Sequence, residues 1–86
     1  MDAYVLIQTW PEGAPAVLQA AQANSRVVAV DRVEGAFDLI VRVPAEDEKE
    51  VLLHLLRLDE TIRALVCRPP RASALSGSTL AVSPVD

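Results

Sequence analysis

The sequence predicts a small α+β domain whose elements follow one another in the order β-α-β-β-α-β. Three observations predict it: two β-rich runs joined around Gly35, one further β-rich run at each end of the domain, and two helix-forming segments between these runs. At 86 residues the chain has room for one such domain, with a core that is only just large enough. Association between copies is therefore expected from length alone.

The first strand and the first helix are expected within residues 3–23. Residues 3–9 are rich in β-forming side chains and end before Pro11, which cannot donate to a sheet. Alternate residues of this strand point to opposite faces. A turn at residues 11–13 then leads to a helix predicted over residues 14–23, with a proline tolerated in its first turn.

Residues 27–43 are the most informative stretch, because two β-rich runs are joined there by a turn at residues 34–36. Gly35 can adopt the positive φ angle that a two-residue hairpin turn needs, so a tight hairpin is predicted. Directly after the turn, alternation places Phe37 on the face that the helices cover. Asp38 is expected on the opposite face of the sheet.

The second helix is predicted over residues 45–58, after Pro44 ends the third strand. Its first turns are acidic and Arg57 lies near its end, an order that complements the helix dipole. The last strand is expected over residues 61–67. Together the elements predict a ferredoxin-like sandwich, a four-stranded antiparallel sheet with both helices on one face.

The chain is expected to form one domain over residues 1–68, followed by a C-terminal tail over residues 69–86. The tail is rich in Pro, Ala, Ser and Gly. We expect it to pack on a neighbouring subunit.

The side of the sheet away from the helices is part apolar and part polar, which predicts dimers formed through the sheet, and larger rings.

Composition excludes several classes of function. The net charge of −4 argues against direct binding of nucleic acid. One cysteine, Cys67, and one histidine, His54, exclude an internal disulfide and a Cys/His zinc site, and no cofactor is expected. The N-terminus lacks a basic segment followed by an apolar one, and no apolar run is long enough to span a bilayer, so a cytoplasmic protein is expected.

The run Glu-Gly-Ala-Phe-Asp at residues 34–38 matches a glycine, any residue, aromatic, aspartate signature. Together with the opening Met-Asp-Ala-Tyr-Val-Leu-Ile-Gln-Thr and the element order, it resembles the ligand-binding (RAM) domain of Lrp/AsnC-type transcriptional regulators, in the stand-alone form without a DNA-binding part. The resemblance covers residues 2–68. It implies a non-enzymatic domain that dimerises, assembles into octamers or decamers, and binds amino acids or related effectors between subunits.

The resemblance also implies the site residues. The signature loop lies at the effector site of the family, which carries that role onto Gly35, Ala36 and Asp38, and Arg63 stands where the family often has a similar residue. A carboxylate can accept hydrogen bonds from an α-ammonium group, while loop N–H groups can donate to the α-carboxylate. The family's Thr-x-Thr pair is absent from the last strand, where residues 64–66 are Ala-Leu-Val.

Other readings stay open at this point. Asp38 can instead cap the hairpin or pair with Arg42. Both Arg42 and Arg63 can hold an effector carboxylate or form surface ion pairs, and Cys67 is expected to be a small core residue. The leading functional prediction is an effector-binding and assembly module that modulates full-length Lrp/AsnC regulators. The alternatives are a small enzyme of the dimeric α/β-barrel type, and a purely structural ring-forming domain or an amino-acid-binding domain of the ACT type.

Overall fold

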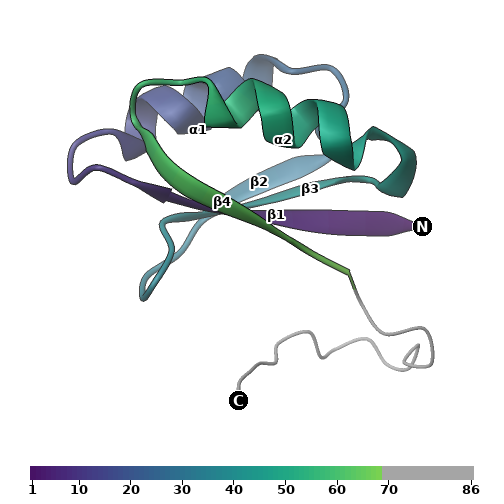
Figure 1. The fold of residues 1–86 in the computed structure, drawn as a ribbon, viewed down its shortest axis with the longest axis horizontal. Helices are drawn as coiled ribbons and strands as arrows, with labels where there is room; N and C mark the ends of the chain where they lie inside the picture. The colour runs from purple at the N-terminus through teal and green to yellow at the C-terminus, as the bar shows by residue number, and fades with distance from the viewer. Residues whose placement is uncertain (69–86) are drawn as a thin grey trace.

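Residues 1–68, which the computed structural model describes, form a four-stranded sheet covered on one side by two helices (Figure 1). The strands are β1 (Asp2–Thr9), β2 (Ala29–Arg32), β3 (Leu39–Pro44) and β4 (Thr61–Cys67), and the helices are α1 (Ala14–Ala23), the 3₁₀ helix η1 (Ala45–Asp47) and α2 (Glu48–Leu56). The strand order is β2-β3-β1-β4, with every neighbouring pair antiparallel. The predicted ferredoxin-like α+β fold is confirmed.

The predicted bounds hold for α1 and β4, whereas the second helix differs from its prediction. Instead of one helix over residues 45–58, the chain forms η1 and then α2, which ends at Leu56. After α2 the chain forms a tighter turn of the 3₁₀ type. There the N–H of Leu58 donates to the carbonyl of Leu55, three residues earlier, at 3.3 Å. No helix within residues 1–68 has the length and apolar character needed to cross a membrane. The tail and its expected packing lie outside the described residues.

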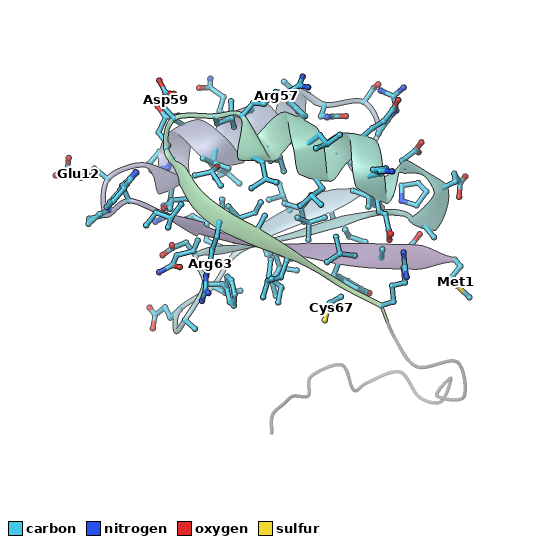
Figure 2. The ribbon with its side chains drawn as sticks, in the orientation of Figure 1. Met1, Glu12, Arg57, Asp59, Arg63 and Cys67 are labelled. Atoms are coloured by element: carbon cyan, nitrogen blue, oxygen red, sulfur yellow. The ribbon has the colours of Figure 1, made fainter. Side chains whose placement is uncertain are left out.

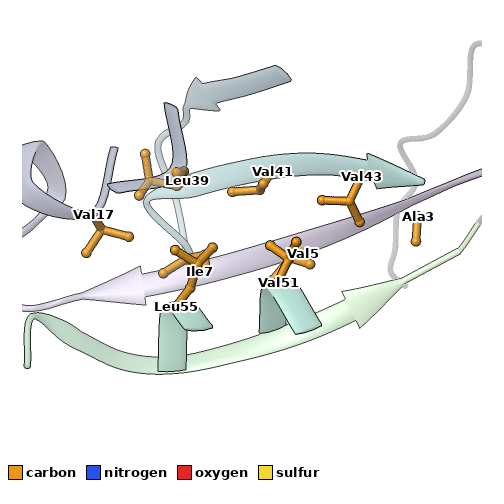
Figure 3. Packing of buried hydrophobic residues seen from close by; sticks show 10 residues of the cluster. Ala3, Val5, Ile7, Val17, Leu39, Val41, Val43, Val51 and Leu55 are labelled. Carbon is orange, nitrogen blue, oxygen red and sulfur yellow. The ribbon is translucent and has the colours of Figure 1, made fainter. Parts of the chain in front are cut away.

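The core lies between the sheet and the helices (Figure 3). Alternate side chains of β1 and β3 are fully buried there, which confirms the period of two expected for a half-covered strand. The helices contribute one stripe each. The fully buried apolar side chains are Ala3, Val5, Ile7, Val17, Ala21, Leu39, Val41, Val43, Val51 and Leu55.

The connection between β2 and β3 is longer than predicted. Six residues, 33–38, link the strands instead of a two-residue turn, and the N–H of Val33 donates to the carbonyl of Asp38 at 2.9 Å. Gly35 has φ +124°, so its expected positive φ is confirmed. β3 begins only at Leu39, because the N–H of Asp38 donates to the carbonyl of Ile7 at 2.8 Å. The side chain of Asp38 also points toward β1.

Candidate functional site

The predicted site residues gather at one end of the sheet, where β1 ends, β4 begins and the segment 33–38, called the loop 33–38 below, crosses between β2 and β3. Gly35, Ala36 and Asp38 belong to this loop. Arg63 reaches the same place from the third position of β4, where it lies opposite Gln8 of β1. The sheet thus holds together residues from three separate parts of the sequence.

Asp38 anchors the loop to the end of β1. Its Oδ2 accepts a hydrogen bond from the N–H of Thr9 at 2.8 Å and lies 3.4 Å from Oγ1 of the same residue. Thr9 is 6% exposed and is a polar residue at the edge of the apolar core. Because β3 begins at Leu39, opposite Ile7, the Thr9 N–H lies past the β3 ladder, and the Asp38 side chain supplies its acceptor.

Arg63 makes two side-chain contacts. Its Nε donates to Oε1 of Gln8 at 3.0 Å, and its Cζ lies 5.3 Å from the centre of the Phe37 ring, within the range of a cation–π contact. Figure 2 shows Arg63 on the side of the sheet away from the helices. Within residues 1–68 it makes no ion pair. Its charge is therefore not neutralised by a carboxylate of the described part of the chain.

Two predictions about which face a residue occupies are wrong. Phe37 does not continue the buried row of β3: it precedes the strand, is only half-buried, and its ring lies under Arg63. Cys67 is exposed and is not a core residue, because the β1–β4 register sets it opposite Tyr4 on the uncovered side (Figure 2). For Cys67 the register of β4 with β1 decides the face, whereas Phe37 lies outside β3, so the alternation of that strand does not extend to it.

Arg42 forms a surface ion pair, one of the two roles expected of it, and its partner is Asp2. Its Nε lies 2.7 Å from Oδ2 of Asp2, and this hydrogen bond, with the accompanying charge attraction, raises the pKa of Arg42 above its ordinary value. Arg42 lies opposite Tyr4, toward the start of β1, whereas Asp38 is bound at the far end of the same strand. The alternative pairing of Asp38 with Arg42 is therefore wrong. The side chain of Asp38 does not cap the hairpin either, because it accepts from the N–H of Thr9 at the end of β1.

The uncovered side of the sheet, called the open face below, has an apolar row in its middle. Leu6 of β1 lies opposite both Ile40 of β3 and Leu65 of β4, and opposite residues of antiparallel strands share one face. Leu65 is 49% exposed. Beside this row lie Tyr4 and Cys67 on one side, and Gln8 with Arg63 on the other. The loop 33–38 therefore borders an apolar surface.

Sequence reasoning missed Thr9, Gln8 and Phe37 as parts of this site. Alternation along β1 places Gln8 on the open face, but nothing local shows that Arg63 stands opposite it.

Within residues 1–68, no three His, Cys, Asp or Glu side chains converge as a metal ion would need.

Comparison with known proteins yields similar solved structures. No family model matches the chain, and no curated protein matches it. TTHA0845 from Thermus thermophilus matches with a TM-score of 0.69 and 26% identity, over 76% of this chain and 86% of that chain. FFRP-DM1 matches with a TM-score of 0.63 and 22% identity, over 76% of this chain and 92% of that chain.

A third similar structure is longer than this chain. MtbAldR matches with a TM-score of 0.63 and 18% identity over 76% of this chain, but over only 48% of its own length. FFRP-DM1 and MtbAldR are Lrp/AsnC-family proteins. The described part of this chain thus has a fold that occurs in Lrp/AsnC-family proteins.

Proposed function

We propose that this protein is a non-enzymatic domain that binds a small effector, an amino acid or an analogue, and that it assembles into oligomers related to those of Lrp/AsnC regulators. One observation carries the proposal: the loop with the Gly-x-aromatic-Asp signature and Arg63 meet at one end of the open face, in a fold shared with FFRP-DM1 and MtbAldR. Gly35, Ala36, Asp38 and Arg63 are the proposed effector-binding residues.

The chemistry of this end of the sheet suits a small polar effector. A Cβ built on Gly35 would have no atom within 4 Å, so the backbone of the loop is open to an approaching group. The backbone N–H groups of the loop 33–38 and the Arg63 guanidinium are donors for an anion. Each charge-assisted hydrogen bond contributes about 1.5–3 kcal/mol, so two or three can support micromolar to millimolar binding after the costs of association.

Assembly is proposed to occur through the open face. The row of Leu6, Ile40 and Leu65 is the apolar surface that a second sheet would cover. A neighbouring copy laid on this row would border the loop 33–38 and close the site from outside. Octamers or decamers built from such dimers follow the resemblance to the family. Through mixed assembly, the protein would modulate full-length Lrp/AsnC regulators.

The layer beneath the helices offers little to an enzyme of the dimeric α/β-barrel type. Such enzymes place polar or acid-base groups in a cavity between sheet and helices. In the described part of this chain the buried residues of that layer are apolar, apart from Thr9, whose backbone N–H is taken by Asp38. Thr61, opposite Thr9 at the start of β4, adds one buried hydroxyl without a hydrogen-bond partner, but Arg63 lies on the other side of the sheet, which favours the binding proposal.

Calorimetric titration with each of the twenty amino acids tests the proposal, using the parent and two variants. Ala36→Trp fills the space beside the loop without removing the contacts of Asp38, and Ala23→Trp makes the same change at an exposed position of α1. We expect at least one amino acid to bind the parent and Ala23→Trp, and to lose its heat of binding with Ala36→Trp. Equal binding by all three proteins would place the site elsewhere.

Mixed assembly has its own test. Native mass spectrometry of this protein mixed with a full-length Lrp/AsnC regulator should show oligomers that contain both chains. Masses of the two separate assemblies only, after subunit exchange has been allowed, would contradict the proposed modulation. A mobility-shift assay with operator DNA and this protein alone should show no complex.

A further inference from the structure

A hollow of about 340 Å³ lies between α2 and the segment 24–28, which connects α1 to β2. The residues that line it are Asn24, Arg26, Glu50, Leu53, His54 and Arg57. Figure 2 shows Arg57 on the helical side of the sheet and Arg63 on the other side. The hollow therefore shares no residue with the proposed effector site.

The side-chain amide of Asn24 has one orientation that satisfies both of its neighbours. Its Oδ1 accepts a hydrogen bond from the N–H of Arg26 at 2.9 Å, and because a backbone N–H only donates, the atom facing it must be the amide oxygen. The amide nitrogen Nδ2 therefore faces His54, 2.9 Å from the ring nitrogen Nδ1. Since an amide nitrogen only donates, Nδ1 of His54 accepts and carries no proton.

This hydrogen bond determines what His54 offers to the hollow. A neutral imidazole whose Nδ1 is unprotonated carries its proton on Nε2, so the remaining ring nitrogen is a donor. Asn24 is itself fixed, because its N–H donates to the carbonyl of Ala21 at 3.1 Å and its carbonyl accepts from the N–H of Val27 at 3.0 Å. Asn24 is thus a positioning residue, which sets the tautomer of His54.

Two guanidinium groups line the same hollow. Nε of Arg26 lies 2.8 Å from Oε1 of Glu50 and 3.6 Å from Oδ1 of Asp47, so carboxylates already balance its charge. The terminal nitrogens of Arg26 make no ion pair within residues 1–68, and Arg57 makes none at all within this range. Arg57 thus brings to the hollow a positive charge that no described carboxylate meets.

The end of α2 does not oppose an anion beside Arg57. Unpaired carbonyl groups at a helix C-terminus repel negative charge. Here the N–H of Arg57 donates to the carbonyls of Leu53 at 3.2 Å and His54 at 3.3 Å, and the N–H of Leu58 takes the carbonyl of Leu55. The last turn of α2 therefore has its carbonyls occupied, and its side chains decide what binds.

We propose that this hollow binds the phosphoryl group of a small phosphate monoester, with Arg57 and the Nε2–H of His54 as the recognising donors and Arg26 as a third. Donors from three side chains suit an anion with three terminal oxygens better than a carboxylate, which has two. Leu53 also lines the hollow and is 45% exposed, so the organic part of the ester has an apolar surface to lie on. The inference goes beyond the proposed function and does not depend on it.

The tautomer of His54 is the first test. Two-bond ¹H–¹⁵N couplings are measured at about pH 8, above the range in which imidazoles ordinarily titrate. The parent should show the Nε2–H form. Asn24→Ala should raise the share of the Nδ1–H form, a change that a merely structural role of Asn24 would not produce. An Nδ1–H form in the parent, or an unchanged tautomer in Asn24→Ala, would overturn the assigned roles of these two residues.

Binding is tested with phenyl phosphate and phenylacetate at the same pH and constant ionic strength. We expect phenyl phosphate to bind at least about tenfold more tightly in calorimetry, because it offers more charge and one more oxygen to the donors. It should also shift the side-chain ¹⁵N resonances of His54 and Arg57. Equal affinity for the two probes, no binding of phenyl phosphate, or binding that leaves both resonances unmoved would contradict the inference.

Two variants assign the effect to Arg57. Arg57→Gln should weaken phenyl phosphate about tenfold, since the uncompensated charge is lost. Arg32→Gln removes the same charge from an exposed residue of β2 that makes no ion pair within residues 1–68, and should bind within about twofold of the parent. Backbone amide spectra show that each variant is folded. Equal weakening in both folded variants would mean that only net charge matters, and the phosphoryl site would be refuted.

The outcomes also separate this inference from the proposed function. If phenyl phosphate binds at His54 and Arg57 while no amino acid binds, the inference stands and the amino-acid effector fails. If an amino acid binds and phenyl phosphate does not, the inference fails and the proposed function stands.

Discussion

The two faces of the sheet are made by the same strands, yet they have opposite roles. On β1, Ala3, Val5 and Ile7 are fully buried against the helices, while the residues between them are partly exposed on the open face. The covered face consists of aliphatic side chains that need only fill space. The open face combines an apolar row with Arg63, Gln8 and the loop 33–38, whose positions depend on specific partners. A strand period of two thus lets one sheet pack a core on one face and carry the proposed binding site on the other.

The largest effect is expected on the covered face. Ile7→Ala removes a fully buried side chain and should lower the free energy of unfolding by about 3 kcal/mol, within the usual range for such core truncations. Leu6→Ala, one residue earlier on the open face, should cost about 1 kcal/mol or less in the unassembled chain. Urea unfolding of both variants measures the difference. Equal losses in the free energy of unfolding would mean that side chains on the two faces contribute equally to stability.

A smaller effect is expected where the loop is anchored to β1. Asp38→Ala leaves the Thr9 N–H without its acceptor and should lower the free energy of unfolding by about 1–3 kcal/mol. Asp31→Ala removes the same charge from an exposed residue of β2 that makes no ion pair within residues 1–68, and should stay within about 0.5 kcal/mol of the parent. If the two variants unfold at the same urea concentration, Asp38 does not hold the loop.

The smallest of these effects on stability concerns Gly35. A Cβ there meets no atom within 4 Å, so space allows Gly35→Ala, but φ +124° does not suit an L-residue. The substitution should cost about 1 kcal/mol or slightly more, from backbone strain alone. Ala36→Gly is the control for altered chain entropy in the same loop and should cost less. A Gly35→Ala protein as stable as the parent would show that the loop can adopt another conformation.

Local pattern was enough to predict the fold. β-forming runs, helix-forming segments and the turn signals between them predicted the element order, and α1 and β4 have the predicted bounds. The covered face of β3 also follows from alternation, because Leu39, Val41 and Val43 are all apolar. These properties depend on neighbours in sequence, which is why sequence alone reveals them.

The site depended on partners far away in sequence, and there the predictions were incomplete. Asp38 is bound to Thr9, 29 residues away, and Arg63 to Gln8, 55 residues away. The Asp38–Thr9 contact accompanies a six-residue connection where a two-residue turn was expected. The Arg63–Gln8 contact gives Arg63 a partner that its own strand does not reveal. Arg42 likewise pairs with Asp2, 40 residues away. Strand register sets all three contacts, and register is not visible in any local stretch.

The oligomeric state of the protein in solution tests most directly whether the open face is the functional face. Size-exclusion chromatography with light scattering should give a dimer or larger assembly for the parent at micromolar concentration. Leu65→Lys, on the open face, should be monomeric, whereas Leu53→Lys, at a similarly exposed position of α2 (49% and 45% exposed), should remain at least dimeric. A monomeric parent, or a Leu65→Lys protein that assembles like the parent, would contradict the account.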